Sequence, residues 1–225
     1  MTPSEITLIF HIIAGSIALT TMSLSYLVKK GPKLHAKIGR IYVYSMIGVG
    51  ITAVTLFIFG SPTFLLLIAF FSLYLVLVGW RFAVNRKGLI TKTDTILIQF
   101  GIIAGLLLLI FAIYIAFSGQ APFGLSNSFA IVPVVFAFLS IGLAYQQKKS
   151  QQTGSNPKGK KRITLHLTYM GAGTISTITA FTITIFDHSI FTWLGATILI
   201  TPILTWYNIR VNKGTVAKNI ISNTN

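Results

Sequence analysis

Three of the four histidines in this sequence lie in or next to long apolar segments, where an ionisable side chain is costly and usually functional. His11, His35 and His166 are each followed at helical spacing by small residues or methionine on the same face. Gly39 follows His35 by one turn, and Met170 follows His166 by one turn. A small residue beside an imidazole leaves room for a flat cofactor such as haem. The same faces also suit close packing between membrane helices, with histidine as a hydrogen-bonding group.

Two of these histidines are expected at the same end of the molecule. His35 precedes one apolar segment and His166 follows the start of another, both next to basic loops, whereas His11 lies toward the opposite end. Straight helices would place the two roughly 14 Å apart in depth at about 1.5 Å per residue, so tilt must close that gap. The sequence therefore predicts a bis-histidine metal or haem b site at His35 and His166, with His11 as an isolated further metal-ligand candidate.

Two arginines at the same end are candidate ligand-binding residues. Arg40 lies on the segment that carries His35, and Arg81 stands in the apolar context Trp80-Arg81-Phe82. A guanidinium there suits a haem propionate, a lipid phosphate or the polar head of a quinone. The alternative is that both side chains extend to the membrane surface as ordinary interfacial cations.

Other catalytic chemistries find little support. The acidic residues are Glu5, Asp94 and Asp187, which excludes paired carboxylates deep in a membrane. There is no cysteine, and no nucleotide-binding or hydrolase motif occurs in a suitable context. A zinc hydrolase needs three ligands at one depth, which only the two histidines and Asp94 approach. His188, beside Asp187, is expected to be a loop residue or a partner for His11. Whether the protein is an enzyme stays open.

The composition indicates an all-α integral membrane protein. Of 225 residues, 53% are hydrophobic and 9% charged, far from the roughly 25% charged residues of soluble domains. The net charge of +15 resides in short loops between apolar runs, which excludes nucleic acid as the expected partner. The expected partners are the lipid bilayer and anionic lipid headgroups at a basic cytoplasmic face.

Seven apolar segments are long enough to cross a bilayer as helices. With the N-terminus outside and the C-terminus cytoplasmic, all 18 Lys and Arg residues fall on the cytoplasmic side. We therefore predict a single domain over residues 1–225, a seven-helix bundle that is a multi-pass protein of the cell membrane. The predicted spans cover residues 6–28, 41–59, 64–84, 95–118, 129–145, 163–186 and 193–209.

The chain resembles a family of small prokaryotic polytopic membrane proteins, the domain of unknown function 2306 family. The matching motifs contain the histidines and Arg81 and extend over most of the chain. They are His11-Ile12-Ile13-Ala14-Gly15, Leu34-His35-Ala36-Lys37-Ile38-Gly39-Arg40 with Met46, Ser72-Leu73-Tyr74 to Gly79-Trp80-Arg81, and His166 to Met170 followed by Thr179-Ala180-Phe181. The resemblance implies a polytopic helical bundle and supplies no established activity.

The chain departs from the family pattern at two positions. The family often has a basic residue after the second histidine, where this chain has Ala36. It also often has an acidic residue at the end of the fifth span, where this chain reads Tyr145-Gln146-Gln147. An inner-face ion pair of the family is therefore not expected here.

These observations lead to two functional hypotheses. The first is a b-type haem or quinone-linked electron-transfer protein, with a cofactor site formed by His35, His166, Arg40, Arg81, Met170 and Gly39. The second is a non-catalytic accessory subunit of a larger membrane complex or a small-solute transporter, in which histidines and glycines serve packing.

Overall fold

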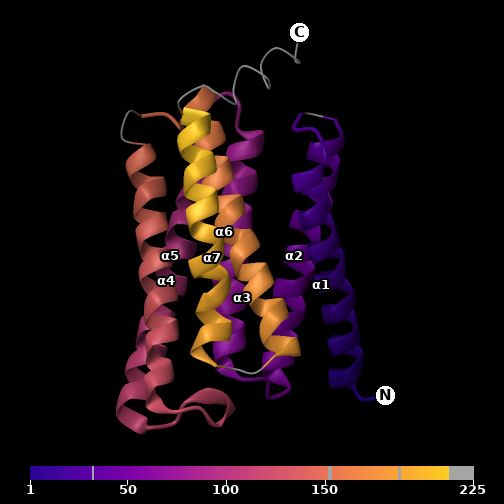
Figure 1. Ribbon diagram of the computed structural model, residues 1–225, viewed down its shortest axis with the longest axis vertical. Helices are drawn as coiled ribbons and strands as arrows, with labels where there is room; N and C mark the ends of the chain where they lie inside the picture. Colours follow the sequence, from indigo (N-terminus) through magenta and orange to yellow (C-terminus); the bar gives the residue numbers. More distant parts are fainter. Residues whose placement is uncertain (32, 152–153, 187–188, 213–225) are drawn as a thin grey trace.

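Seven long α-helices make up most of the computed structural model, which describes residues 1–31, 33–151, 154–186 and 189–212 (Figure 1). No strand occurs in these residues, so the predicted all-α fold class is confirmed. The helices are α1 (Pro3–Leu27), α2 (Leu34–Ile58), α3 (Thr63–Val84), α4 (Lys92–Ser118), α5 (Ile131–Ser150), α6 (Gly159–Ile185) and α7 (Ile190–Asn212), with short 3₁₀ turns η1 (Pro122–Gly124) and η2 (Asn127–Ala130) before α5.

The helices extend beyond several predicted spans. α2 begins at Leu34 rather than residue 41, and α6 begins at Gly159 rather than residue 163. Hydrophobicity marks only the part of a helix that suits a bilayer core, whereas backbone hydrogen bonding continues through basic residues at the interface. Six of the described helices, all but α6, are long and apolar enough to cross a membrane.

Helix α3 lies at the centre of the bundle. It packs against α2, α4 and α6, while α1 packs on α2, α5 on α4 and α7 on α6. Figure 1 shows the α1–α2 hairpin on one side and the α4–α5 pair on the other, with α3, α6 and α7 between them. Aromatic side chains fill the end of the core near the α6–α7 connection, where Phe64, Phe129 and Trp193 contact one another and are fully buried.

Helix α6 differs from the others because its buried face is rich in hydroxyl groups. Thr174, Ser176, Thr177 and Thr179 are buried. Thr174 and Thr177 donate their hydroxyl hydrogens to the carbonyls four residues earlier, those of Met170 and Gly173. Serine and threonine at helix interfaces of membrane proteins also bond across helices. The polar composition of α6 therefore reflects its place inside the bundle.

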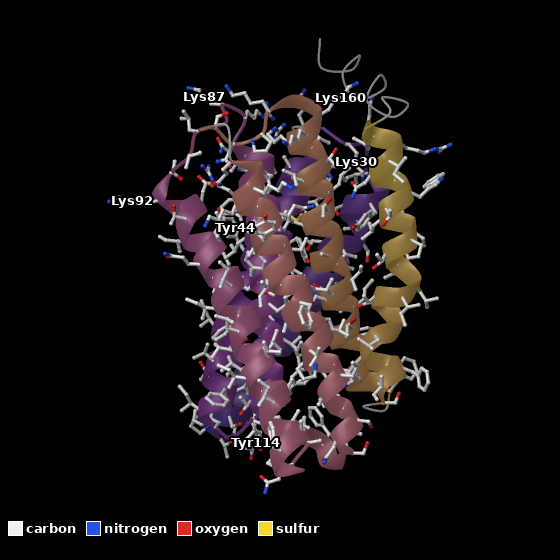
Figure 2. The ribbon with its side chains drawn as sticks, turned by 90° about the vertical axis from the view of Figure 1, so that its left-hand side faces the viewer. Lys30, Tyr44, Lys87, Lys92, Tyr114 and Lys160 are labelled. Atoms are coloured by element: carbon white, nitrogen blue, oxygen red, sulfur yellow. The ribbon has the colours of Figure 1, made fainter. Side chains whose placement is uncertain are left out.

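Lysine side chains gather at one end of the bundle. Lys30, Lys87, Lys92 and Lys160 lie there, and Tyr114 lies at the other end (Figure 2). We call the first the basic end. α1 runs from the opposite end toward Lys30, so His11 lies in the half of the bundle away from the basic end.

Candidate functional site

His35 and His166 lie next to each other at the basic end. Their ring centroids are 6.4 Å apart, and the ring planes are nearly perpendicular at 86°. The expected depth difference of roughly 14 Å is wrong, because α6 begins at Gly159. Its first two turns extend past the start of α2, which brings His166 level with His35 in the first turn of α2.

Both imidazoles are anchored through Nδ1. The His166 Nδ1 lies 2.9 Å from the carbonyl oxygen of Gly79 in α3, and the His35 Nδ1 lies 3.2 Å from that of Ser25 in α1. A carbonyl oxygen accepts hydrogen bonds and cannot donate them, so each Nδ1 carries a proton. A neutral ring then has its lone pair on Nε2. This is the arrangement in which histidines bind metals, with the other nitrogen held by a carbonyl.

The separation of the two rings suits ligation of one metal ion. Two nitrogens bound to one ion at about 2.0 Å each, on opposite sides of it, lie about 4 Å apart, whereas at a tetrahedral ion they lie about 3.3 Å apart. Each ring centroid is about 1 Å behind its ligating nitrogen, which gives about 6 Å between centroids at this bond length. The observed 6.4 Å is close to that value.

Further along α2 and α6, long side chains connect the two helices. The Tyr42 hydroxyl lies 3.1 Å from the Thr177 hydroxyl, and the Met46 sulfur lies 3.8 Å from the same Thr177 oxygen. A β-carbon added at Gly39, one turn after His35, would meet no atom within 4 Å. The role of Gly39 as a small residue beside a cofactor stays a prediction.

Met170 packs tightly on α3. A β-carbon added at Gly79 would lie 2.9 Å from the Met170 Cγ, too close for any larger residue to fit without movement. The glycine therefore lets α3 and α6 approach closely. Because the Gly79 carbonyl also anchors His166, this close approach positions one ring of the pair.

Two cations that sequence reasoning missed lie near the pair. The Lys30 ammonium donates to the carbonyls of Ser25 and Tyr26 at 2.6 and 3.1 Å, and burial lowers its pKa below the usual value. Arg162 donates to the last carbonyls of α3, those of Phe82 and Ala83, both at 2.7 Å. The signal was present in the sequence, since Arg162 precedes His166 by one helical turn.

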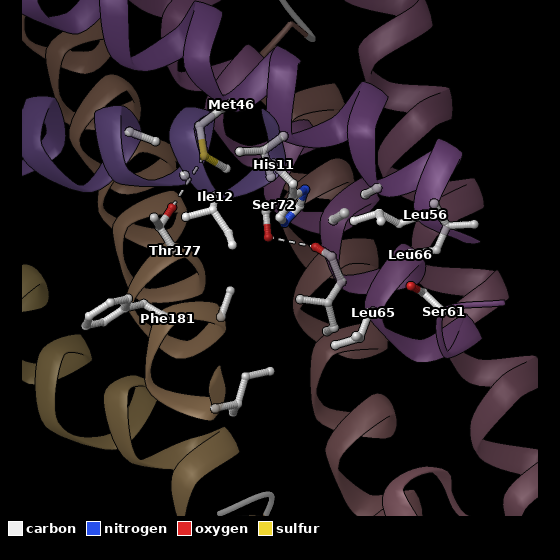
Figure 3. A pocket seen from close by; sticks show the side chains of 18 of the residues that line it. His11, Ile12, Met46, Leu56, Ser61, Leu65, Leu66, Ser72, Thr177 and Phe181 are labelled. Atoms are coloured by element: carbon white, nitrogen blue, oxygen red, sulfur yellow. Dashed lines mark hydrogen bonds between the residues drawn. The ribbon is translucent and has the colours of Figure 1, made fainter. Parts of the chain in front are cut away.

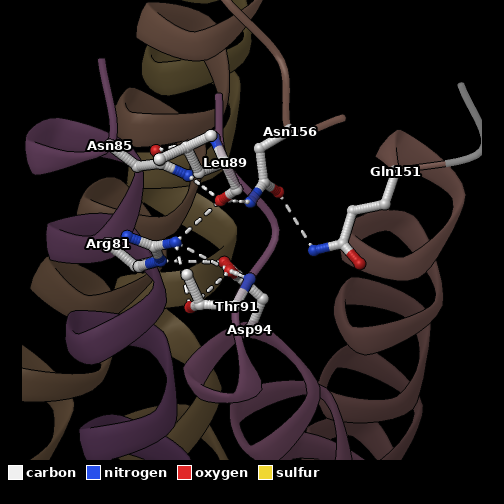
Figure 4. A network of polar contacts seen from close by, with 7 residues as sticks. All are labelled: Arg81, Asn85, Leu89, Thr91, Asp94, Gln151 and Asn156. Atoms are coloured by element: carbon white, nitrogen blue, oxygen red, sulfur yellow. Dashed lines mark hydrogen bonds and ion pairs between the residues drawn. The ribbon is translucent and has the colours of Figure 1, made fainter. Parts of the chain in front are cut away.

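Arg81 belongs to a different cluster. Its guanidinium holds Asp94 through two hydrogen bonds, Nε to Oδ1 at 2.9 Å and Nη2 to Oδ2 at 2.7 Å, and also reaches Thr91 and the Leu89 carbonyl (Figure 4). Arg81 follows Gly79 by two residues, about 200° around the helix, so it faces α4 while Gly79 faces α6. The structure therefore does not bring Arg81 to the histidine pair.

The Leu89 carbonyl joins two loops of the basic end. It accepts hydrogen bonds from Arg81, Asn85 and Asn156, so the α3–α4 loop is tied to the α5–α6 loop (Figure 4). Asp94 itself is 1% exposed and also accepts from the backbone N–H of Thr91 at the start of α4. Asp94 is thus a structural group in this fold.

The remaining candidates lie away from the pair. Arg40 is exposed and stands about 140° around α2 from His35. His11 bonds to Thr52 in the other half of the bundle. Asp187 and His188 lie outside the described residues. Among the described residues, no three His, Cys, Asp or Glu side chains are grouped to hold a metal, so a three-ligand zinc site is not found there.

Comparison with known proteins gives no assignment: no family model, curated protein or solved structure matches the chain. The resemblance to the domain of unknown function 2306 family therefore stays a prediction. The functional conclusion rests on the geometry of the side chains.

Proposed function

We propose that this chain is a multi-pass protein of the cell membrane in which His35 and His166 bind a b-type haem for electron transfer. The observation that carries the proposal is the imidazole pair, with ring centroids 6.4 Å apart and both Nδ1 atoms held by backbone carbonyls. His35 and His166 would hold the haem, and a haem held by two histidines would favour electron transfer over oxygen chemistry.

The orientation follows from the charge distribution. We place the N-terminus outside and the basic end in the cytoplasm, with α6 as the seventh span, because Lys and Arg are retained on the cytoplasmic side. Lys30, Lys87, Lys92 and Lys160 at one end support this orientation. The same side chains would contact anionic lipid headgroups.

The residues around His35 and His166 would orient the two rings, leave room for the haem and bind its carboxylates. Ser25 and Gly79 hold the Nδ1 protons and thereby direct Nε2 of each ring away from the backbone. Gly39 leaves room on the α2 side for a flat group. Lys30 and Arg162 supply positive charge for its carboxylates, the task that sequence reasoning had assigned to Arg40 and Arg81. Haem supplies one-electron redox chemistry when bound.

One optical measurement tests the proposal. The full chain is expressed with added haem precursor and purified in detergent, and the reduced-minus-oxidised spectrum is recorded. We expect a Soret and an alpha band, both absent from His166→Ala and His35→Ala. His11→Ala is the matched control, since it removes a membrane histidine outside the pair, and it retains both bands. Colourless unsubstituted protein would refute haem binding.

A further inference from the structure

A cavity of about 320 Å³ lies in the half of the bundle away from the basic end. Residues of α1, α2, α3 and α6 form its wall, among them His11, Gly15, Met46, Ser72, Thr177 and Phe181 (Figure 3). Its volume falls in the range of small-molecule sites, roughly 300–1,000 Å³. The cavity does not include His35 or His166, so it is separate from the proposed haem site.

The wall is apolar and uncharged. It contains no Lys, Arg, Asp or Glu, and its polar side chains are His11 and four serine or threonine hydroxyls. Ser72 donates to the Ile68 carbonyl and Thr177 donates to the Gly173 carbonyl. A charged molecule would lose its hydration there without gaining an ion pair, so the wall selects a neutral one.

The hydrogen bonds of His11 define which polar group it recognises. The Thr52 hydroxyl donates to the Gly48 carbonyl at 2.8 Å, so its single hydrogen is committed. Thr52 must then accept from His11 Nδ1, which lies 2.8 Å from its oxygen. In the neutral ring Nε2 is therefore an acceptor, and it belongs to a side chain that lines the cavity.

Access to the cavity is from the bilayer. Ile12 and Phe181 both line it and are 56% and 45% exposed, on the faces of α1 and α6 that would meet lipid. A molecule dissolved in the membrane reaches the cavity between these helices without crossing water.

We infer that this cavity binds a neutral, lipid-soluble molecule that carries a hydroxyl group, and that the hydroxyl donates to His11 Nε2. Two sources share this chemistry, the phenolic head of a quinol and an isoprenoid alcohol. A fatty acid or phospholipid headgroup is excluded by its charge, and a simple ether or ketone lacks the hydrogen that Nε2 needs.

Binding of defined probes to the full chain in detergent tests the inference. Tritiated farnesol and a reduced short-chain quinol are the two ligands, with farnesyl methyl ether and oleate as competitors. We expect at least one alcohol to bind saturably and about tenfold more tightly than the ether, as one hydrogen bond supplies. The alcohol that binds identifies the source.

Two variants locate the site. His11→Phe keeps a ring and removes the acceptor, so the alcohol and the ether bind equally. Gly15→Leu fills the cavity, because a β-carbon added there meets no atom within 4 Å, and it abolishes binding of both alcohols. The matched control is Gly142→Leu on α5, where a β-carbon also has open space; this glycine is exposed and binding is unchanged.

The inference is overturned if neither alcohol binds, if the ether or oleate competes as well as the alcohol, or if Gly15→Leu binds like Gly142→Leu. Gly15→Leu leaves His11 intact and so keeps the test valid should His11→Phe fail to fold. This test does not measure haem content. A colourless protein that binds farnesol would therefore refute the proposed function and leave the inference about the cavity intact.

Discussion

The two ends of the bundle use histidine in opposite ways. At the basic end, His35 and His166 face each other and Lys30 and Arg162 lie nearby. In the other half, His11 is isolated in an uncharged wall beside a cavity. All three rings are anchored at Nδ1. Two neighbouring rings of this kind suit a metal, whereas a single ring in an apolar wall suits a hydroxyl donor. The surroundings, more than the residue type, decide the chemistry.

The largest expected effect separates the two ends directly. The double substitution His35→Ala with His166→Ala removes the whole optical signal of bound haem, whereas His11→Ala leaves haem content per protein unchanged. Haem extraction with pyridine measures that content. Equal loss in both proteins would show that the contrast between the ends is wrong.

The next effect concerns the polar cluster that supports the basic end. Asp94→Ala leaves the partly buried Arg81 guanidinium without its carboxylate, which costs about 3 kcal/mol of unfolding free energy. The expected result is a clear loss of thermal stability in detergent. Glu5→Ala, which removes an exposed carboxylate from the capping box of α1, is the control and costs about 1 kcal/mol. Similar melting curves for the two variants would contradict the structural role of Asp94.

A smaller effect links packing to the histidine pair. Gly79→Ala introduces a β-carbon 2.9 Å from Met170, so α3 and α6 must separate slightly at a cost of about 1–3 kcal/mol. The shift also moves the carbonyl that anchors His166, and haem affinity falls. Replacing Met170 with Ala in the same protein removes the side-chain contacts but leaves the backbone nitrogen of residue 170 at 3.0 Å, so it restores only part of that affinity. Titration of apoprotein with hemin measures the loss of affinity and its partial recovery. An unchanged affinity in Gly79→Ala would show that the close packing of α3 and α6 does not position His166.

The smallest expected effect tests whether Thr52 keeps the proton of His11 on Nδ1. Thr52→Val removes the acceptor of the Nδ1 proton, so the ring can exchange its two neutral forms. The preference for alcohol over ether in the cavity then falls from about tenfold to about threefold, because part of the population presents a donor. Competition binding detects this change. A preference that stays at the original level would show that Thr52 does not fix the ring.

The sequence predicted helices better than it predicted partners. The lengths of the apolar segments predicted the seven helices, and the basic loops next to His35 and His166 predicted that both lie at one end. The partner of Arg81 did not follow from spacing, because Asp94 meets it only once α3 and α4 pack together. Lys30 and Arg162 were overlooked because their charge was attributed to membrane orientation alone. The cavity could not be predicted, since its wall combines four helices that are distant in sequence.

The threonine-rich face of α6 has a consequence for biosynthesis. A helix inserts into the bilayer according to the free energy of its transfer into lipid. Because α6 carries many hydroxyls, this free energy favours its insertion only weakly when it leaves the translocation channel as a single helix. α6 makes most of its contacts with α3 and α7, one made long before it and one made just after. We therefore expect α6 to remain in the channel until α7 emerges, so that the last two helices enter the bilayer as a hairpin against an α3 that is already in place.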